Sequence, residues 1–256
     1  MKPLLAPRPG DRPSEEDSQT YYEIDCPQQD EVADVELSLR ELAACGILPD
    51  GAGYDAQAFA RFRDAIKQHF EVPWTAIRPA MERLLFALSG ARRPRTIIGL
   101  GTFCGNTLAW NVGPALSPWR AFEADRIIGV DTDAEACELA RANFARLGVA
   151  EEVEILTADG HQVVRDFDDT IDLLYLDAHG PLPGTNQPAT KMIYLSLLQE
   201  AEGKLRPGSL VVAHDTLPEW FVKQAGAYLD YVRDSRRFAA SASVAIDDQG
   251  LEITKV

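Results

Sequence analysis

The stretch from Thr96 to Trp110 constrains the fold more than any other part of this chain. A short apolar run, 96–100, is followed directly by a turn that contains Gly101 and Gly105, and a helical segment follows. Gly101 permits a sharp turn and the close approach of a ligand, while the helix start offers free N–H groups and a positive dipole end. This arrangement is typical of nucleotide-type cofactor sites. The spacing is not the dinucleotide fingerprint G-x-G-x-x-G, so an ordinary strand-to-helix turn is the alternative.

A second apolar strand, 127–130, ends at Asp131. An acid at the end of the second strand of a βαβ unit is placed to accept the ribose hydroxyls of an adenosine ligand. Asp is also a favoured helix N-cap, and a helix is expected to begin just after Asp133. We therefore expect Asp133 to cap this helix and Asp131 to bind the ligand.

Strands and helices alternate regularly from residue 96 to the end of the chain. The expected strands cover 96–100, 127–130, 153–156, 171–176, 210–213, 242–246 and 252–256. The expected helices cover 106–112, 134–147, 160–167, 190–204 and 220–233. Very apolar strands that alternate with helices predict a parallel sheet covered on both faces. The fold class is therefore α/β, with a doubly wound, mostly parallel, seven-stranded Rossmann-like sheet and an antiparallel hairpin at one edge.

The first part of the chain differs in character from the rest. Residues 1–20 are polar and rich in proline, which is typical of a disordered arm. Three helices are expected after the arm, over 31–45, 56–70 and 75–88. We therefore divide the chain into an N-terminal arm with a helical cap or lid, 1–72, and a Rossmann-like domain, 73–256. Tyr21 and Tyr22 either face a cation with their rings or anchor the arm to the body.

Composition and charge narrow the possible partners. The chain is 46% hydrophobic and 25% charged, which suits an ordinary globular protein with an ample core. Its net charge of -15 argues against a nucleic-acid partner, because no basic stripe is available to bind phosphates. No apolar run is long enough to span a bilayer, and the four cysteines lack paired spacing. We expect a cytoplasmic protein that binds neither nucleic acid nor membrane.

Five motifs occur in an order that resembles a known family. They are GTFCGNT, GVDTDAEACELARANF, VEILTADG, IDLLYLDAHG and LRPGSLVVAHDT. Together they resemble class I S-adenosylmethionine-dependent methyltransferases, and more narrowly the catechol and caffeoyl-CoA O-methyltransferases, over residues 74–256. The resemblance implies S-adenosylmethionine as cofactor, a small-molecule substrate, N-terminal helices that roof the substrate pocket, a homodimer and a place in secondary metabolism.

The resemblance also assigns roles to residues at the carboxyl ends of the strands, where this fold binds its ligands. The residues implied to bind the methionine end of the cofactor are Gly101, Thr102, Phe103, Gly105, Asn106 and Thr107. The ribose is implied to bind to Asp131 and Thr132, and the adenine to Asp159, Gly160 and His161. Asp177 and His179 come nearest the sulfonium, and His214 and Asp215 face the acceptor. These last four are the candidate catalytic residues, although hydrogen-bonded histidines with a structural role are the alternative for His179 and His214.

The chain departs from the family pattern at three positions. Gly99 stands where the family usually carries an acid that holds the cofactor's ammonium group. The family binds a divalent metal through one carboxylate and an Asp-Asn pair, whereas here Asp177 and Asp215 are joined by Thr216. Two carboxylates and a hydroxyl are able to hold Mg²⁺ with waters, so the metal is left open. The family's catalytic lysine follows the first carboxylate closely, but here a long insertion is expected to place Lys191 too far away.

Three functions follow from these features. The first is methyl transfer to an oxygen, or to another small nucleophile, with His214, His179 or a metal activating the acceptor. The second is cyclisation of S-adenosylmethionine to azetidine-2-carboxylate with release of methylthioadenosine, as in the methyltransferase-like azetidine-2-carboxylate synthases; the missing acid at Gly99 motivates it, with Phe103 or the tyrosine pair steadying the sulfonium. The third is a non-catalytic cofactor-binding protein, which ranks last because Asp131 and Asp159 are intact.

Overall fold

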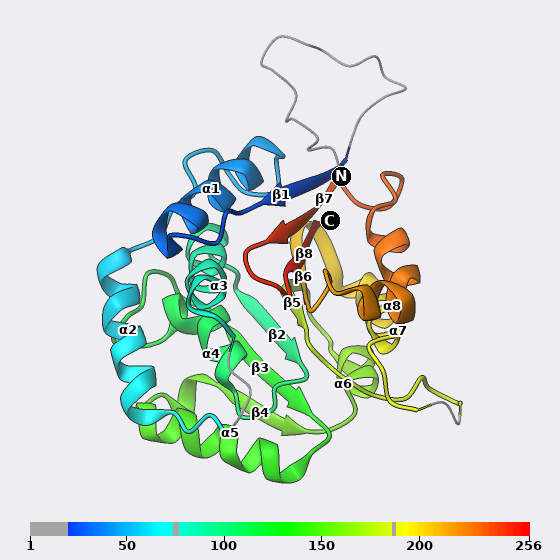
Figure 1. The fold of residues 1–256 in the computed structure, drawn as a ribbon. Helices are drawn as coiled ribbons and strands as arrows, with labels where there is room; N and C mark the ends of the chain where they lie inside the picture. Colours follow the sequence, from blue (N-terminus) through cyan, green and yellow to red (C-terminus); the bar gives the residue numbers. More distant parts are fainter. Residues whose placement is uncertain (1–19, 74–76, 186–187) are drawn as a thin grey trace.

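One mixed sheet runs through the computed structural model, which describes residues 20–73, 77–185 and 188–256 (Figure 1). Its strands are β1 (Tyr21–Asp25), β2 (Thr96–Leu100), β3 (Arg126–Asp131), β4 (Glu154–Thr157), β5 (Ile171–Leu176), β6 (Leu205–His214), β7 (Ala240–Ala245) and β8 (Leu251–Lys255). The eight strands lie in the order β1-β7-β8-β6-β5-β2-β3-β4. The proline-rich arm, 1–19, and the start of the third expected helix, 75–76, lie outside the described residues.

Helices cover both faces of the sheet. They are α1 (Glu31–Ala44), α2 (Ala56–His69), α3 (Pro79–Arg92), α4 (Asn106–Val112), α5 (Ala134–Leu147), α6 (Gly160–Asp166), α7 (Ile193–Ala201) and α8 (Glu219–Val232). Three 3-10 helices, η1 (Gly113–Ala115), η2 (Ala150–Glu152) and η3 (Glu202–Lys204), complete the described elements. The first five α-helices lie on one face of the sheet and α6 to α8 on the other, over two separate layers of buried apolar side chains (Figure 1). No helix in the described ranges is long and apolar enough to cross a membrane.

The pairing of the strands confirms the predicted α/β class. Strands β2 to β6 pair in parallel, and β8 pairs antiparallel with both β6 and β7. The strand count needs a correction, because Tyr21–Asp25 forms an eighth strand that pairs in parallel with β7. The antiparallel hairpin is therefore not at the edge of the sheet. Only Ile24 of this strand is buried, so hydrophobic alternation along the sequence gave little sign of it.

The N-terminal helices extend the helical layer on one face of the sheet. Helix α1 packs against α3, α3 against α4, and α2 against α5. The ring of Phe62 in α2 lies 5.4 Å from that of Trp110 in α4 and 5.7 Å from that of Phe86 in α3. The same apolar core therefore continues across residue 72, and the division of the chain at that point stays a prediction.

Candidate functional site

A cavity of about 1420 Å³ lies at the carboxyl ends of β2 to β6. Each of these strands sends the loop that follows it into the cavity lining, as expected for a doubly wound sheet. The rim adds Ile77 and Arg78 before α3 and the turn between β7 and β8. The candidate residues that line it are Gly101, Thr102, Phe103, Asn106, Thr107, Asp131, Thr132, Asp159, Gly160, His161, Asp177, His179, His214 and Asp215. The predicted cofactor and catalytic residues thus converge on one cavity, with Gly105 just behind it.

The turn after β2 requires its glycines. Gly101 has φ +88°, and a Cβ atom there would lie 2.4 Å from the backbone nitrogen of Ala178. Gly105, at φ +83°, is the N-cap of α4, where a Cβ atom would lie 2.9 Å from a ring carbon of Phe144. Both residues are therefore needed to bring the backbone of this turn close to the end of β5 and to α5.

Of the two roles predicted for Asp131 and Asp133, the structure confirms the helix cap by Asp133. Asp133 caps α5, because its Oδ1 accepts hydrogen bonds from the backbone N–H groups of Glu135 and Ala136. Asp131 lies in the cavity lining, where its Oδ2 accepts from the N–H of Phe103 at 2.8 Å. The carboxylate therefore ties the turn after β2 to the end of β3. Its Oδ1 accepts from the N–H of Asp133 at 3.1 Å. Ribose binding by Asp131 stays a prediction.

Asp159 and His161, which follow β4, form hydrogen bonds within the protein that the sequence did not predict. Asp159 caps α6 and accepts from the backbone N–H groups of His161 and Gln162 at 2.7 and 3.2 Å. The Nε2 atom of His161 lies 2.8 Å from the hydroxyl of Ser196 in α7. Both side chains therefore shape the wall of the cavity, and adenine binding there stays a prediction.

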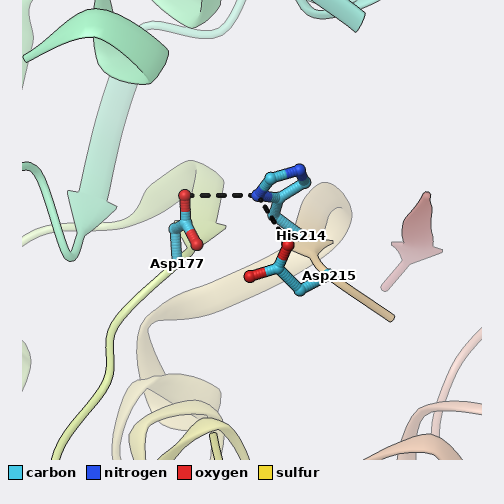
Figure 2. A group of neighbouring side chains, drawn as sticks. All are labelled: Asp177, His214 and Asp215. Carbon is cyan, nitrogen blue, oxygen red and sulfur yellow. Dashed lines mark ion pairs between the residues drawn. The ribbon is translucent and has the colours of Figure 1, made fainter. Parts of the chain in front are cut away.

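Asp177, His214 and Asp215 meet at the ends of β5 and β6 (Figure 2), and Lys191, just before α7, joins them. The Nζ atom of Lys191 lies 2.7 Å from Oδ1 of Asp177 and 3.1 Å from Oδ2 of Asp215. The Nδ1 atom of His214 lies 3.4 Å from Oδ2 of Asp177 and 3.5 Å from Oδ1 of Asp215. Each carboxylate therefore presents one oxygen to the lysine and the other to the histidine.

The expectation that the insertion removes Lys191 from the site is wrong. Gly180 and Thr190 exchange backbone hydrogen bonds, N–H to O, at 3.2 and 2.8 Å. This bridge closes the insertion into a loop and returns the chain to the end of β5. Lys191 therefore reaches Asp177 although it is far along the sequence.

The pKa values of the cluster follow from burial and charge acting in opposite directions. Burial raises the pKa of Asp177, but the charges of Lys191 and then His214 outweigh it and bring the value to about 2. Burial lowers the pKa of Lys191, and the two carboxylates more than reverse this effect, so the ammonium form is stabilised. For His214, burial again lowers the pKa, while Asp177 first and Asp215 second raise it above its usual value.

A divalent metal does not fit this donor set. The ligating atoms of Asp177, His214 and Asp215 lie within 4.8 Å of one another, a spacing that would suit a metal. However, the Lys191 ammonium lies between the two carboxylates and would repel a second cation. Thr216, which stands where the family carries an Asn, is buried and is not part of the cavity lining.

Three other predicted participants lie apart from the cluster. His179 is exposed at the cavity rim. Tyr21 and Tyr22 lie in β1, and neither lines the cavity. The guanidinium of Arg233 lies 4.1 Å from the centre of the Tyr21 ring, so the cation that this ring faces belongs to the protein itself. This placement favours the anchoring alternative over a lid for the tyrosine pair.

The sequence of the chain is similar to those of known proteins. Residues 98–216 match a family model described as a methyltransferase domain. A catechol O-methyltransferase of Niastella koreensis is 24% identical over 216 residues, covering 82% of this chain and 89% of that protein. The O-methyltransferase hkm8 of Aspergillus hancockii is 33% identical over 101 residues, 39% of this chain and 38% of its own length.

Solved structures agree with the matches in sequence. The O-methyltransferase TomG from Streptomyces achromogenes, solved with S-adenosylmethionine (SAM), superposes with a TM-score of 0.57 at 20% identity, covering 80% of this chain and 91% of TomG. An O-methyltransferase from Bacillus cereus in complex with SAH has a TM-score of 0.57 at 13% identity, covering 87% of this chain and 100% of its own. This chain has a class I SAM-dependent methyltransferase fold. Within that fold, the matched region contains every candidate site residue except Tyr21 and Tyr22.

Proposed function

We propose that this protein transfers a methyl group from SAM to an oxygen atom of a small molecule. The observation that carries the proposal is the setting of His214. Its Nδ1 lies 3.4 and 3.5 Å from two carboxylates, and both ring nitrogens are buried without a hydrogen-bond partner among the residues that the structure describes. An imidazole held in this way at a cavity wall is suited to accept a proton from a bound hydroxyl group.

The cavity has residues suited to the cofactor. The turn after β2, Asp131 and the start of α6 together offer backbone N–H groups, a carboxylate for hydroxyl groups and an apolar wall. When bound, SAM supplies an electrophilic methyl group on a positively charged sulfur. The chain's part is to hold the two reactants in line and to exclude competing water.

The proton and the methyl group then move in opposite directions at the acceptor oxygen. The acceptor O–H donates its proton to Nε2 of His214, and the oxygen forms a bond to the methyl carbon as the carbon–sulfur bond breaks. The sulfur keeps that electron pair and becomes a neutral thioether. Asp177 and Asp215 stabilise the imidazolium that forms, because their charges lie within 3.5 Å of Nδ1.

The size of the cavity supports an acceptor molecule beside the cofactor. Its volume of about 1420 Å³ exceeds the roughly 300–1,000 Å³ that is usual for a single ligand. A reaction of the cofactor with itself requires no such additional space. Cyclisation to azetidine-2-carboxylate has no separate structural observation in its favour and is an outcome of the test.

Product analysis by mass spectrometry tests the proposal. The purified protein would be incubated with SAM alone and then with a panel of phenols, catechols and other small hydroxyl compounds. We expect S-adenosylhomocysteine and an acceptor whose mass has grown by one CH₂ group. Methylthioadenosine without any acceptor would instead indicate cyclisation, and intact SAM throughout would indicate a binding protein.

We also propose a homodimer, a cytoplasmic location and a role in secondary metabolism. A homodimer, as in the resembling family, is tested by sedimentation velocity. A cytoplasmic location and a role in secondary metabolism are consistent with the acidic charge and with a small acceptor. The charge of -15 also supports a small molecule rather than a nucleic acid as the substrate.

A further inference from the structure

We propose that the side chain of Lys191 is a built-in substitute for a divalent cation, so that the site works without a metal and becomes a metal site when the lysine is removed. This inference deepens the proposed function, because it concerns the same two carboxylates. The four oxygen atoms of these carboxylates are shared between Lys191 and His214, and Figure 2 shows the two that face the histidine.

The ammonium group is fixed in its position. Besides the two carboxylates, its Nζ lies 3.1 Å from the backbone oxygen of Asp177 and 2.9 Å from the hydroxyl of Tyr194. That hydroxyl lies 3.3 Å from the backbone oxygen of His214. An ammonium has three N–H donors, and these four oxygen partners leave none of them directed at the cavity. Lys191 is therefore a positioning residue and not the base that meets the acceptor.

A metal would have to displace this group. Mg²⁺ takes oxygen ligands at about 2.0–2.1 Å in near-octahedral geometry. Lys191 already lies between one oxygen of Asp177 and one oxygen of Asp215, at 2.7 and 3.1 Å. The side chain is nearly fully buried, so it has no solvated position to which it could withdraw while keeping its partners. One cation or the other occupies this space, and the chain supplies its own.

A single positive charge also suits the histidine better than a double one. Two carboxylates and one ammonium carry one net negative charge, which a proton on His214 neutralises. A divalent cation would already neutralise both carboxylates, and protonation of His214 would then leave a net positive cluster. The lysine therefore matches a site in which the imidazole, rather than a metal, takes the acceptor's proton.

The test is a titration with Mn²⁺ alone, followed by electron paramagnetic resonance of the free ion. Wild type is expected to bind no Mn²⁺ at this site. Lys191→Met is expected to bind it at least about tenfold more tightly than wild type does, because the ion no longer has to displace an ammonium held by both carboxylates. Lys191→Arg, which keeps the charge, should behave as wild type, and Lys223→Met on the exposed face of α8 serves as the matched control.

Two outcomes would overturn the inference. One is wild-type binding of Mn²⁺ as tight as that of Lys191→Met, and the other is a wild-type activity that EDTA abolishes and Mg²⁺ restores. If Lys191→Met fails to fold, the wild-type titration and the EDTA experiment still decide. The titration requires no methyl transfer, so exclusion of Mn²⁺ without any methylated product would contradict the proposed function and leave this inference standing.

Discussion

His214 is the single residue on which the proposed reaction depends most. Replacing it with Gln removes the base but keeps a side chain of similar polarity at the cavity wall. We expect kcat to fall by roughly 10²–10⁴, the usual contribution of a general base. The affinity for SAM, measured by calorimetry, should stay unchanged, because the proposed role of His214 is to take the proton of the acceptor. An unchanged kcat would remove His214 from the mechanism.

The pH dependence of the reaction follows from the same residue. Burial lowers the pKa of His214, but Asp177 and Asp215 raise it more than burial and Lys191 lower it, so the value lies above the usual 6.5. The neutral imidazole is the active form, so kcat/KM should rise with pH through this elevated pKa. Asp177→Asn removes the strongest raising charge and should move the rising limb to lower pH. A limb that does not move would show that another group is titrating.

Residues next to a strand end were predictable, and residues joined through space were not. Asp131, Asp177 and His214 each follow an apolar run directly, so the topology alone places them at the cavity. Lys191 was not predicted to lie at the site, because it is far from Asp177 along the chain. The bridge between Gly180 and Thr190 brings it back to the end of β5. The two glycines in the inserted loop were a signal that it could fold back on itself.

At the level of secondary-structure elements, the turn from β2 to α4 depends on Gly101. Gly101→Ala would place a Cβ atom 2.4 Å from the backbone of Ala178 and strain a residue at φ +88°. Since backbone atoms cannot give way as a side-chain end can, we expect a loss of about 2 kcal/mol or more in the free energy of unfolding. Gly226→Ala in α8, which meets no atom within 4 Å, is the control. Urea unfolding measures both, and equal stability of the two variants would contradict this account.

The edge formed by β1 and β7 depends on a buried ion pair beneath it. Glu252 of β8 is fully buried and is held by Arg233 at 2.8 Å and by the hydroxyl of Ser241 at 2.7 Å. Arg233→Ala leaves this carboxylate without its cation and removes the group over the Tyr21 ring. We expect a loss of about 3 kcal/mol, the lower end for a broken buried pair because Arg233 is partly exposed.

The matched control for this prediction is Arg236→Ala, since Arg236 is an exposed arginine paired with Asp234. We expect that control to change stability far less, because water and salt screen an exposed ion pair. Chemical denaturation of both variants measures the difference, and a similar small loss in each would show that Glu252 does not require its partner. The strand β1 itself was missed, because a five-residue strand with one buried side chain carries almost no periodic signal.

For the molecule as a whole, alternation of strands and helices was enough to predict the doubly wound sheet. It was not enough to place α1 to α3. Amphipathic helices that precede β2 fit equally well over a pocket or beside α4 and α5. The structure puts them beside α4 and α5, where the rings of Phe62 and Trp110 meet. Long-range packing of this kind leaves no local pattern in the sequence.

Binding of the cofactor should stabilise the entire fold, because the cavity joins five strand ends into one site. SAM at a hundred times its Kd is expected to add about 2.7 kcal/mol, which corresponds to a rise in Tm of roughly 5–10 °C for a chain of this size. Asp131→Asn should lower the affinity about 10- to 100-fold, since a hydrogen bond to a charged acceptor is lost. Its Tm rise at the same SAM concentration should be correspondingly smaller.

Differential scanning calorimetry across a series of SAM concentrations measures this shift. Tyr21→Phe is the matched control, because Tyr21 lies in β1 and does not line the cavity. Its dependence of Tm on SAM should equal that of wild type even if its Tm without ligand differs. A lost or weakened SAM response in Tyr21→Phe would restore a ligand-facing role for the tyrosine pair. A wild-type response in Asp131→Asn would remove Asp131 from the cofactor site.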